Sequence, residues 1–379
     1  MAVGSGRPIR VLVVDDSAFM RRVITRILES DPAVQVVGTA RDGLEAVARA
    51  GLLRPDVITL DVEMPRLDGL AALPQILAVH PCPVVMVSSL TQQGAQATVR
   101  ALALGAVDFV AKPSGAVSLD LDRVGAELVA KVKAAAAIPH PQTRGRGPAG
   151  GAAARSRPGP ETGPKAISGP GAATGTGSGH GVPGAPRALT HLVLVASSTG
   201  GPGALYRLLG ALPGDLPAAV VIVQHMPPTF TRALAQHLDE VSGLAVAEAW
   251  DGARLRDGSA WVAPGDHHLE VTAGGVLRLD QGPPLHGVRP AADVTFASVP
   301  EELARRAIVL VLTGMGADGA MGAQRLHRLG ARVWVQDPGS CVVAGMPGAT
   351  AALGIAERSG PPEDLARWLV EALGGGVKG

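Results

Sequence analysis

The stretch Leu192–Gly203, LVLVASSTGGPG, limits the fold of this chain more than any other part of the sequence. Its first four residues are apolar, which is typical of a strand buried on both faces. Ser197, Ser198 and Thr199 end the apolar run, and two glycines then precede a helix-like pattern. A buried strand, a glycine turn and a helix start place short polar side chains where open α/β proteins bind ligands.

Two roles fit Ser198 at this position. The start of a helix supplies unpaired backbone N–H groups that favour negative charge, so a serine there can act as a nucleophile beside an oxyanion site. A serine in the same place can also be a simple helix cap. This stretch alone leaves both roles open.

Length and charge narrow the class of protein. A chain of 379 residues fits two domains with connectors better than a single core. The net charge of +1 gives no electrostatic argument for nucleic-acid binding. Met1–Pro8 has no apolar core, so we expect no signal peptide, and no apolar run reaches the ~20 residues of a membrane span. We therefore expect a cytoplasmic, monomeric protein without membrane insertion.

In the first third of the chain, five apolar strands alternate with helical patterns, which predicts a doubly wound parallel sheet. We expect strands at Ile9–Val14, Val34–Val37, Asp56–Leu60, Val84–Val87 and Val107–Val110, and helices at Ala18–Glu29, Leu44–Ala50, Leu70–Val79, Gln96–Leu104 and from Leu119 to about Ala137. Polar residues follow the strands at their carboxyl ends, which parallel strands bring to one edge: Asp15, Asp16, Asp61, Ser88 and Lys112.

These polar residues predict a site for a cation and a phosphoryl group. Clustered carboxylates repel one another unless a cation lies among them, and oxygen ligands suit Mg²⁺. Asp61 is alone on its strand and can attack a phosphoryl group, while Lys112 offsets charge and Ser88 donates a hydrogen bond. A single aspartate at a strand end is ordinary turn chemistry. Five polar residues on four strand ends favour a site.

This part of the chain, residues 7–132, resembles the receiver domain of bacterial response regulators. The matching motifs are VVDDS (Val13–Ser17), DVEMPRLDG (Asp61–Gly69), VSS (Val87–Ser89) and DFVAKP (Asp108–Pro113). The resemblance implies a flavodoxin-like fold and phosphorylation of Asp61 by a histidine kinase. It also implies that Mg²⁺ is held by Asp15, Asp16, Asp61 and the backbone carbonyl of Glu63, and that Ser88, Phe109 and Lys112 form the switch.

Residues 139–186 are dominated by Pro, Gly, Ala, Ser and Thr, with almost no large apolar side chain. Such a segment buries too little apolar surface to offset its chain entropy, so we expect a disordered, flexible linker. We interpret its scattered basic residues as parts of a solvated tether: Arg144, Arg146, Arg155, Arg157 and Lys165.

The second predicted domain, residues 187–374, again has a mainly parallel sheet. After Leu192–Val195 we expect strands at Ala219–Val223, Val246–Ala249, Ala260–Ala263, Ala307–Leu312 and Arg332–Gln336, a hairpin of Leu269–Val271 with Val276–Leu279, and a helix at Ala291–Glu302. Ser198, His225 and Asp318 follow three of the strands. A hydroxyl, an imidazole and a carboxylate are the parts of a hydrolytic triad, which is recognised by geometry and not by chain order.

A competing interpretation comes from Gly314, Gly316 and Gly319, which spell GxGxxG between a strand and a helix. Asp337 follows about 20 residues later, where a dinucleotide-binding fold has its ribose-binding acid. The motif lies late in the domain, however, and it gives Ser198 and His225 no role.

Residues Leu192–Leu373 resemble the catalytic domain of the chemotaxis protein-glutamate methylesterases. The matching stretches are SSTGGP (Ser197–Pro202), VQHMPPTFT (Val223–Thr231), VAPGDHHL (Val262–Leu269), LTGMGADGA (Leu312–Ala320), QDP (Gln336–Pro338) and GMP (Gly345–Pro347). The resemblance implies a Rossmann-like three-layer domain that hydrolyses glutamyl methyl esters on methyl-accepting chemoreceptors and deamidates receptor glutamines. It implies Ser198 as nucleophile, His225 as base, Asp318 as its partner, Thr199 and the Met315 N–H beside the oxyanion, and no cofactor in this site.

Four positions depart from the pattern of that family. Ala196–Ser197 replaces Gly-Ala before the nucleophile, Ala317 replaces an asparagine, and Ala291 replaces a common serine. None of these changes removes a triad member, although Ser197 adds a second hydroxyl beside the nucleophile.

Two further hypotheses remain beside a phosphorylation-gated esterase. One is a nucleotide-binding output domain, and the other is an inactive adaptor that binds receptors with the same surface. His267, His268 and Glu270 also suggest a metal cluster, although a surface turn explains them better.

Overall fold

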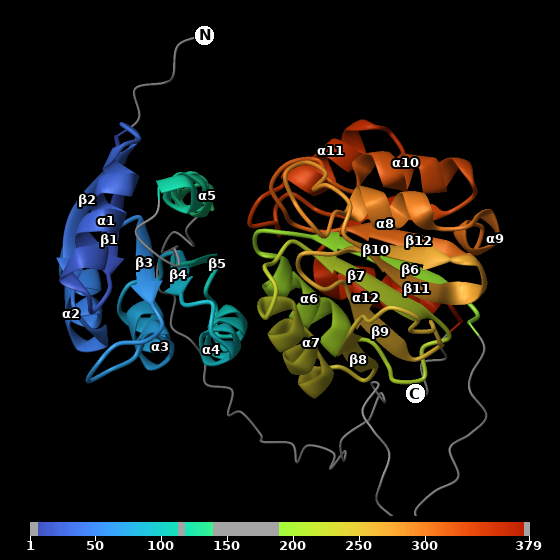
Figure 1. Cartoon of the computed structure of the whole chain (residues 1–379), viewed down its shortest axis with the longest axis horizontal. Coiled ribbons are helices and arrows are strands. Elements are labelled where there is room, and N and C mark those ends of the chain that lie inside the picture. Colours follow the sequence, from blue (N-terminus) through green and yellow to red (C-terminus); the bar gives the residue numbers. More distant parts are fainter. Residues whose placement is uncertain (1–6, 113–117, 139–188, 375–379) are drawn as a thin grey trace, which may run out of the picture.

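The computed structural model describes residues 7–112, 118–138 and 189–374, with only the backbone for 118–123. They form two α/β units, blue to teal and green to red in Figure 1. The predicted linker with its five basic residues, and Pro113, lie outside the described residues.

The first unit has a parallel five-stranded sheet in the order β2-β1-β3-β4-β5, the flavodoxin-like order that was expected. Its elements are β1 (Ile9–Val14), α1 (Ala18–Glu29), β2 (Val34–Ala40), α2 (Gly43–Leu53), β3 (Val57–Asp61), α3 (Gly69–Val79), β4 (Val84–Ser88), α4 (Gln92–Ala103), β5 (Asp108–Ala111) and α5 (Ser118–Ala136). Helices α1 and α5 cover one face and α2, α3 and α4 the other. Helix α5 continues to Ala136, past residue 132 where we placed the end of the domain.

The second unit has a parallel seven-stranded sheet in the order β14-β13-β12-β6-β7-β9-β8, with a separate antiparallel hairpin, β10–β11. Its elements are β6 (Leu192–Ser197), α6 (Gly201–Gly210), β7 (Ala219–Gln224), α7 (Phe230–Val241), β8 (Ala245–Glu248), β9 (Ser259–Val262), β10 (His268–Thr272), η1 (Ala273–Gly275), β11 (Val276–Asp280), α8 (Ala292–Ser298), α9 (Glu301–Ala304), β12 (Ala307–Val311), α10 (Ala320–Arg328), β13 (Arg332–Gln336), α11 (Gly345–Ala352), β14 (Arg358–Gly360) and α12 (Pro362–Ala372). The central strands β6, β7 and β12 are buried along their whole length, as their continuous apolar runs predict.

Two parts of the second unit differ from the sequence-based expectation. The helix predicted over Ala291–Glu302 is two helices, α8 and α9, because Pro300 lacks an N–H and disfavours helical backbone at Val299 before it. The last strand that we expected ends at Gln336. In the structure α11, β14 and α12 follow it and complete the sheet and its helical layer.

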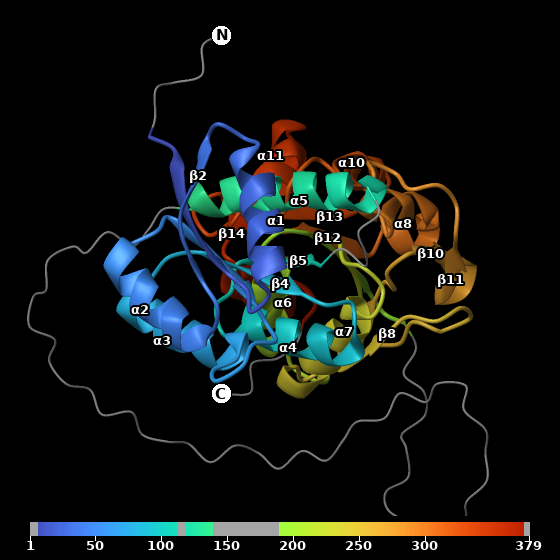
Figure 2. The same ribbon diagram turned by 60° about the vertical axis from the view of Figure 1, so that its left-hand side comes forward.

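The two units are in contact through α4 of the first and α6 and α7 of the second. Figures 1 and 2 both place α4 on the side of the first unit that faces α6 and α7. The ring of Phe109 at β5 stacks on Phe230, the first residue of α7, with centroids 4.4 Å apart. The Tyr206 hydroxyl on α6 donates to the backbone carbonyl of Val99 on α4 over 3.4 Å. Residues of both units thereby join one apolar cluster.

Among the described residues, none of the helices has the length and apolar character needed to cross a membrane.

Candidate active site

The candidate catalytic residues are brought together by the pairing of β6 with β12 on one side and β7 on the other. All three strands run parallel, so their carboxyl ends lie at one edge of the sheet. Ser198 follows β6, His225 follows β7, and the turn after β12 ends near Asp318. In the register of the sheet, Ser197 lies directly opposite Gln224.

His225 and Asp318 form the central hydrogen bond of this edge, with 2.7 Å between Nε2 and Oδ2. An ionised carboxylate only accepts hydrogen bonds, so Nε2 carries the proton and Nδ1 is the free ring nitrogen. Asp318 is 2% exposed and also accepts the backbone N–H groups of Ala292 and Asp293, at 2.6 and 2.9 Å. Burial raises the pKa of Asp318, but the hydrogen bonds from His225 and these N–H groups outweigh it and hold the pKa below its usual range.

Ser198 is held by its backbone at the carboxyl end of β6. Its N–H donates to the carbonyl of Thr313 (3.0 Å), and its carbonyl accepts from Gly201 (2.8 Å) and the Gln224 side chain (2.9 Å). The cap of α6 is Gly200, so Ser198 does not have the capping role that its sequence allowed. No hydrogen bond joins Ser198 Oγ to His225 in the described part of the chain; such contacts commonly tighten only when substrate binds.

Two backbone N–H groups near Ser198 have no hydrogen-bond acceptor among the described residues. Within the described ranges, no hydrogen bond engages the N–H of Thr199 or of Met315. The Thr313 hydroxyl holds the turn of Thr199, because it donates to the Thr199 carbonyl over 2.9 Å. Free N–H groups at fixed positions are suited to stabilise an oxyanion.

Close contacts and backbone conformation explain two glycines of the GxGxxG pattern without a bound nucleotide. A Cβ at Gly314 would lie 2.9 Å from Ser198 Cβ and 2.2 Å from the Met346 sulfur, so only glycine allows this turn to lie so close to Ser198. Gly319 begins α10 with a φ of 89°, a backbone conformation that favours glycine. Asp337, the expected ribose-binding acid, instead accepts from Ser340.

Ser197 is not placed as a nucleophile. Its side chain is fully buried, and its hydroxyl donates to Gln224 Oε1 over 2.7 Å. Our sequence analysis missed Gln224 and Gln336 as parts of this edge, although each is a polar residue that follows a run of apolar residues at the end of its strand.

A second polar site lies at the carboxyl edge of the first sheet. Lys112 Nζ is 2.7 Å from Asp61 Oδ2 and 3.0 Å from Asp15 Oδ2. Burial, partly offset by Lys112, raises the pKa of Asp61 to about 6. Burial lowers the pKa of Lys112, but the two carboxylates outweigh it and leave that pKa above its usual range.

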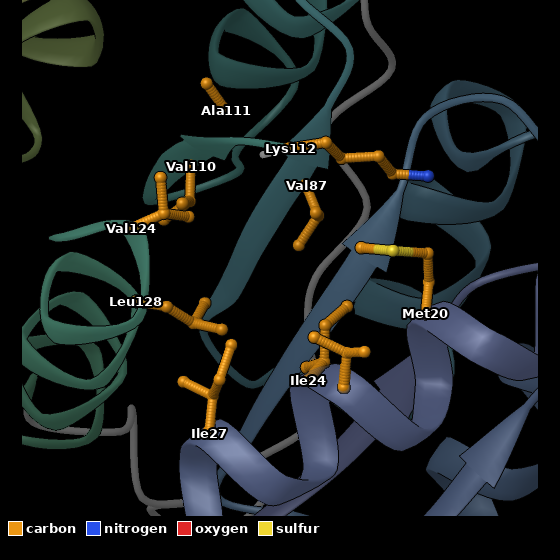
Figure 3. A pocket seen from close by; sticks show the side chains of 10 residues that line it. Met20, Ile24, Ile27, Val87, Val110, Ala111, Lys112, Val124 and Leu128 are labelled. Carbon is orange, nitrogen blue, oxygen red and sulfur yellow. The ribbon is translucent and has the colours of Figure 1, made fainter. Parts of the chain in front are cut away.

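Apolar side chains, Glu63 and Ser88 surround this site. Figure 3 shows Lys112 at the rim of a small apolar cavity of about 20 Å³ between α1 and α5, lined by Met20, Ile24 and Leu128 among others. The Glu63 N–H donates to Asp61 Oδ1 over 3.3 Å. The Ser88 hydroxyl is buried and points to α4, where it donates to the Gly94 carbonyl over 3.1 Å.

Two residue groups in the described ranges have enough ligand atoms close together to hold a metal ion. One is Asp15, Asp16 and Asp61, and the other is His286, Asp293 and Asp318. The suggested cluster of His267, His268 and Glu270 is not among them. His268 is buried, with Nε2 bonded to the Pro283 carbonyl and Nδ1 accepting from Ala291 N–H, so it has a structural role instead of lying in a surface turn.

Comparison with known proteins agrees with this architecture. Residues 193–369 match the family model of the CheB methylesterase, and residues 11–121 match the response regulator receiver domain. The fold and its two sites thus define a response regulator with a methylesterase output domain. The chain belongs to the family of protein-glutamate methylesterase/protein-glutamine glutaminases, as the sequence motifs predicted.

Relatives of that name are similar along the whole chain. The protein from Symbiobacterium thermophilum is 52% identical over 371 residues, 98% of each chain. The protein from Pyrococcus abyssi is 42% identical over 382 residues, 99% of this chain and 97% of the relative. The crystal structure of the Thermotoga maritima CheB methylesterase catalytic domain is 40% identical, with a TM-score of 0.47, covering 48% of this chain and 98% of that one. The Thermotoga maritima CheB response regulator domain is 55% identical, with a TM-score of 0.32, covering 34% and 97%.

The lowered pKa of Asp318 predicts a pH-dependent contribution to stability. A carboxyl whose pKa is lower in the folded state stabilises the fold above its unfolded pKa, and this contribution is lost as pH falls through the folded pKa. The difference in free energy of unfolding between the full chain and its Asp318→Asn variant should be constant above about pH 5 and shrink below about pH 4, near the unfolded pKa of aspartate. Urea denaturation at several pH values measures it. The exposed Asp215→Asn variant is the control, and a difference that grows toward low pH would contradict the prediction.

Proposed function

We propose that this chain is a phosphorylation-activated serine hydrolase that demethylates glutamate methyl esters on chemoreceptors and deamidates receptor glutamines. The observation that carries the proposal is the hydrogen-bonded His225–Asp318 pair at the sheet edge that also carries Ser198. We assign residues 7–132 to the receiver domain, 139–186 to a linker and 187–374 to the catalytic domain.

The reaction uses the three residues as nucleophile, base and orienting acid. Ser198 Oγ attacks the ester carbonyl carbon while its proton moves to His225 Nδ1, and Asp318 orients and stabilises the imidazolium. The N–H groups of Thr199 and Met315 stabilise the oxyanion. The bond to the leaving oxygen then breaks, and methanol departs with the proton from His225. Water hydrolyses the acyl-enzyme in the same way, which frees Ser198 and leaves a glutamate; with glutamine the first product is ammonia.

The esterase chemistry needs no cofactor, because the nucleophile, the base and the oxyanion donors all come from the chain. Phosphoryl transfer from a histidine kinase to Asp61 is different. There, Asp15, Asp16, Asp61 and the carbonyl of Glu63 would hold Mg²⁺, and three carboxylates with ligand atoms within 4.8 Å of one another fit a hard cation. The ion would neutralise charge on the transferring group, and Lys112 would pair with the acyl phosphate.

Ser88 and Phe109 connect the phosphorylation site to the domain interface. In the structure, the Ser88 hydroxyl is bonded to α4, and Phe109 stacks on Phe230 at the start of α7. Helix α7 begins five residues after His225, so the docked receiver lies against the element that follows the base. A cavity of about 450 Å³ lies between α4 and the loop that precedes α7, and Gln92, Gln96 and Thr229 are among its lining residues. The two units are therefore not tightly packed against each other at this point.

Phosphorylation at Asp61 would draw the Ser88 hydroxyl away from the Gly94 carbonyl and change the face of α4 that contacts α6 and α7. A change of a few kcal/mol in docking free energy alters the open fraction by a large factor. Control by docking therefore does not require the linker to transmit force.

Substitutions at the candidate triad should show which of the two neighbouring serine hydroxyls is the nucleophile. Ser198→Ala should lower ester hydrolysis by several orders of magnitude, because no other group forms the acyl-enzyme, and His225→Ala should have a similar effect, because it removes the base. Asp318→Asn should retain more activity, since the carboxylate orients and does not react. Methanol release from methylated receptor membranes measures these rates. Ser197→Ala is the matched control and should cost far less; an equal or greater loss there would show that the wrong hydroxyl has been assigned.

Chelation of divalent metal ions should stop phosphorylation in the first domain and leave ester hydrolysis in the second domain unchanged. Phosphorylation of Asp61 by a small phosphodonor should stop in excess EDTA and return with Mg²⁺. Ester hydrolysis by a fragment of residues 187–379 should continue in the same EDTA, with its circular dichroism spectrum recorded as a check of folding. Loss of hydrolysis on chelation would contradict the proposal and would point to a metal ion at the His286–Asp293–Asp318 group.

Removing the receiver should release the catalytic domain. Deletion of residues 1–139 should raise the basal rate of ester hydrolysis above that of the unphosphorylated full chain, because α4 and Phe109 no longer contact α6 and α7. Ser88→Ala in the full chain should keep the low basal rate and reduce the response to a phosphodonor. If deletion leaves the basal rate unchanged while the phosphodonor still activates the full chain, the receiver acts by stimulation or recruitment instead.

A further inference from the structure

Gln224 is a buried polar side chain that the reaction described above does not use. It is the last residue of β7, is 2% exposed, and lies between the residues assigned as nucleophile and base. Its Nε2 donates to the backbone carbonyl of Ser198 at 2.9 Å and to that of His225 at 3.3 Å. Its Oε1 accepts from the Ser197 hydroxyl at 2.7 Å.

These contacts allow only one orientation of the carboxamide. Nε2 has two hydrogens, and each meets a carbonyl oxygen. If the amide were reversed, Oε1 would face two carbonyl oxygens and no donor would lie between them. The start of α6 closes the site from the other side, because a Cβ at Gly201 would lie 2.0 Å from Oε1.

The same edge has a second buried glutamine, which shows that the arrangement continues across the sheet. Gln336 ends β13, and its Oε1 accepts from the N–H of Thr313 at 2.9 Å. Thr313 in turn accepts the N–H of Ser198 at its carbonyl. Hydrogen bonds therefore run from His225 through Gln224 to Ser198, and on to the turn that carries Met315 and Asp318.

We propose that Gln224 is a positioning residue for ester and amide hydrolysis. Its carboxamide fixes the separation of the turns that carry Ser198 and His225, and the Ser197 hydroxyl satisfies the remaining acceptor. The inference rests on the proposed function. Displacements of about 1 Å at reacting groups can cost on the order of 100-fold in rate, so a group that sets this separation acts on kcat more than on substrate binding.

The test compares steady-state hydrolysis of methylated receptor membranes by full-length variants, with a phosphodonor present. Gln224→Met keeps the length of the side chain and removes the donor, and Gln224→Asn keeps the amide but is too short to reach both carbonyls. Each should lower kcat by about 10- to 100-fold with KM within about twofold of the parent. Ser197→Ala should lower kcat by only about threefold, within the range expected for one hydrogen bond, and should have no further effect in the Gln224→Met background.

Ser259→Ala is the matched control, because Ser259 is also buried and hydrogen-bonded but lies at the opposite, amino-terminal edge of the sheet. It should lower the urea midpoint without changing kcat. A Gln224 variant that keeps kcat within twofold, or that changes only KM, would overturn the inference while leaving the proposed function intact. A parent chain without hydrolysis, or an active Ser198→Ala variant, would overturn the proposed function and this inference together.

Discussion

The register of β6 between β12 and β7 is the constraint on which the catalytic half of this protein depends. Because the three strands are parallel and adjacent, Ser198, His225 and the turn before Asp318 leave the sheet at the same edge. A shift of one residue in β6 would turn its side chains to the opposite face and move Ser197 away from Gln224. Continuous burial of these strands, all 0% exposed from Val193 to Ala196 in β6, makes such a shift costly.

Parallel neighbouring strands also gather polar residues at the carboxyl edge of the first domain's sheet, but these residues have different chemistry. Carboxylates and a lysine replace the serine and histidine, so the edge is suited to a cation and a phosphoryl group instead of an acyl group. Ser88 ends β4, and its hydroxyl donates to the Gly94 carbonyl in the first turn of α4, which packs against α6 and α7. One hydroxyl thus lies between the charge at Asp61 and the surface that contacts the catalytic domain.

Much of this could be predicted from the sequence, because buried parallel strands and the polar residues at their ends leave strong local patterns. The strand order of the first domain, the hairpin and the contact of His225 with Asp318 all agree with the sequence-based expectation. The break between α8 and α9 has a local signal in Pro300, which the expected single helix did not take into account. The contacts of Gln224 could not be derived from local patterns, since they depend on which strands become neighbours. The stacking of Phe109 on Phe230 joins residues 121 positions apart, and neither local sequence pattern predicts this contact.

We propose that Ser198 is the nucleophile and that the docked receiver controls access to it. Labelling with a fluorophosphonate, followed by peptide mapping in a mass spectrometer, tests it in one measurement on the full chain with and without beryllofluoride and Mg²⁺. We expect a single modified residue, Ser198, and faster labelling when the phosphoryl mimic is bound at Asp61. Modification at Ser197 or at no serine of the SSTGGP stretch, or a rate that is the same in both conditions, would contradict it.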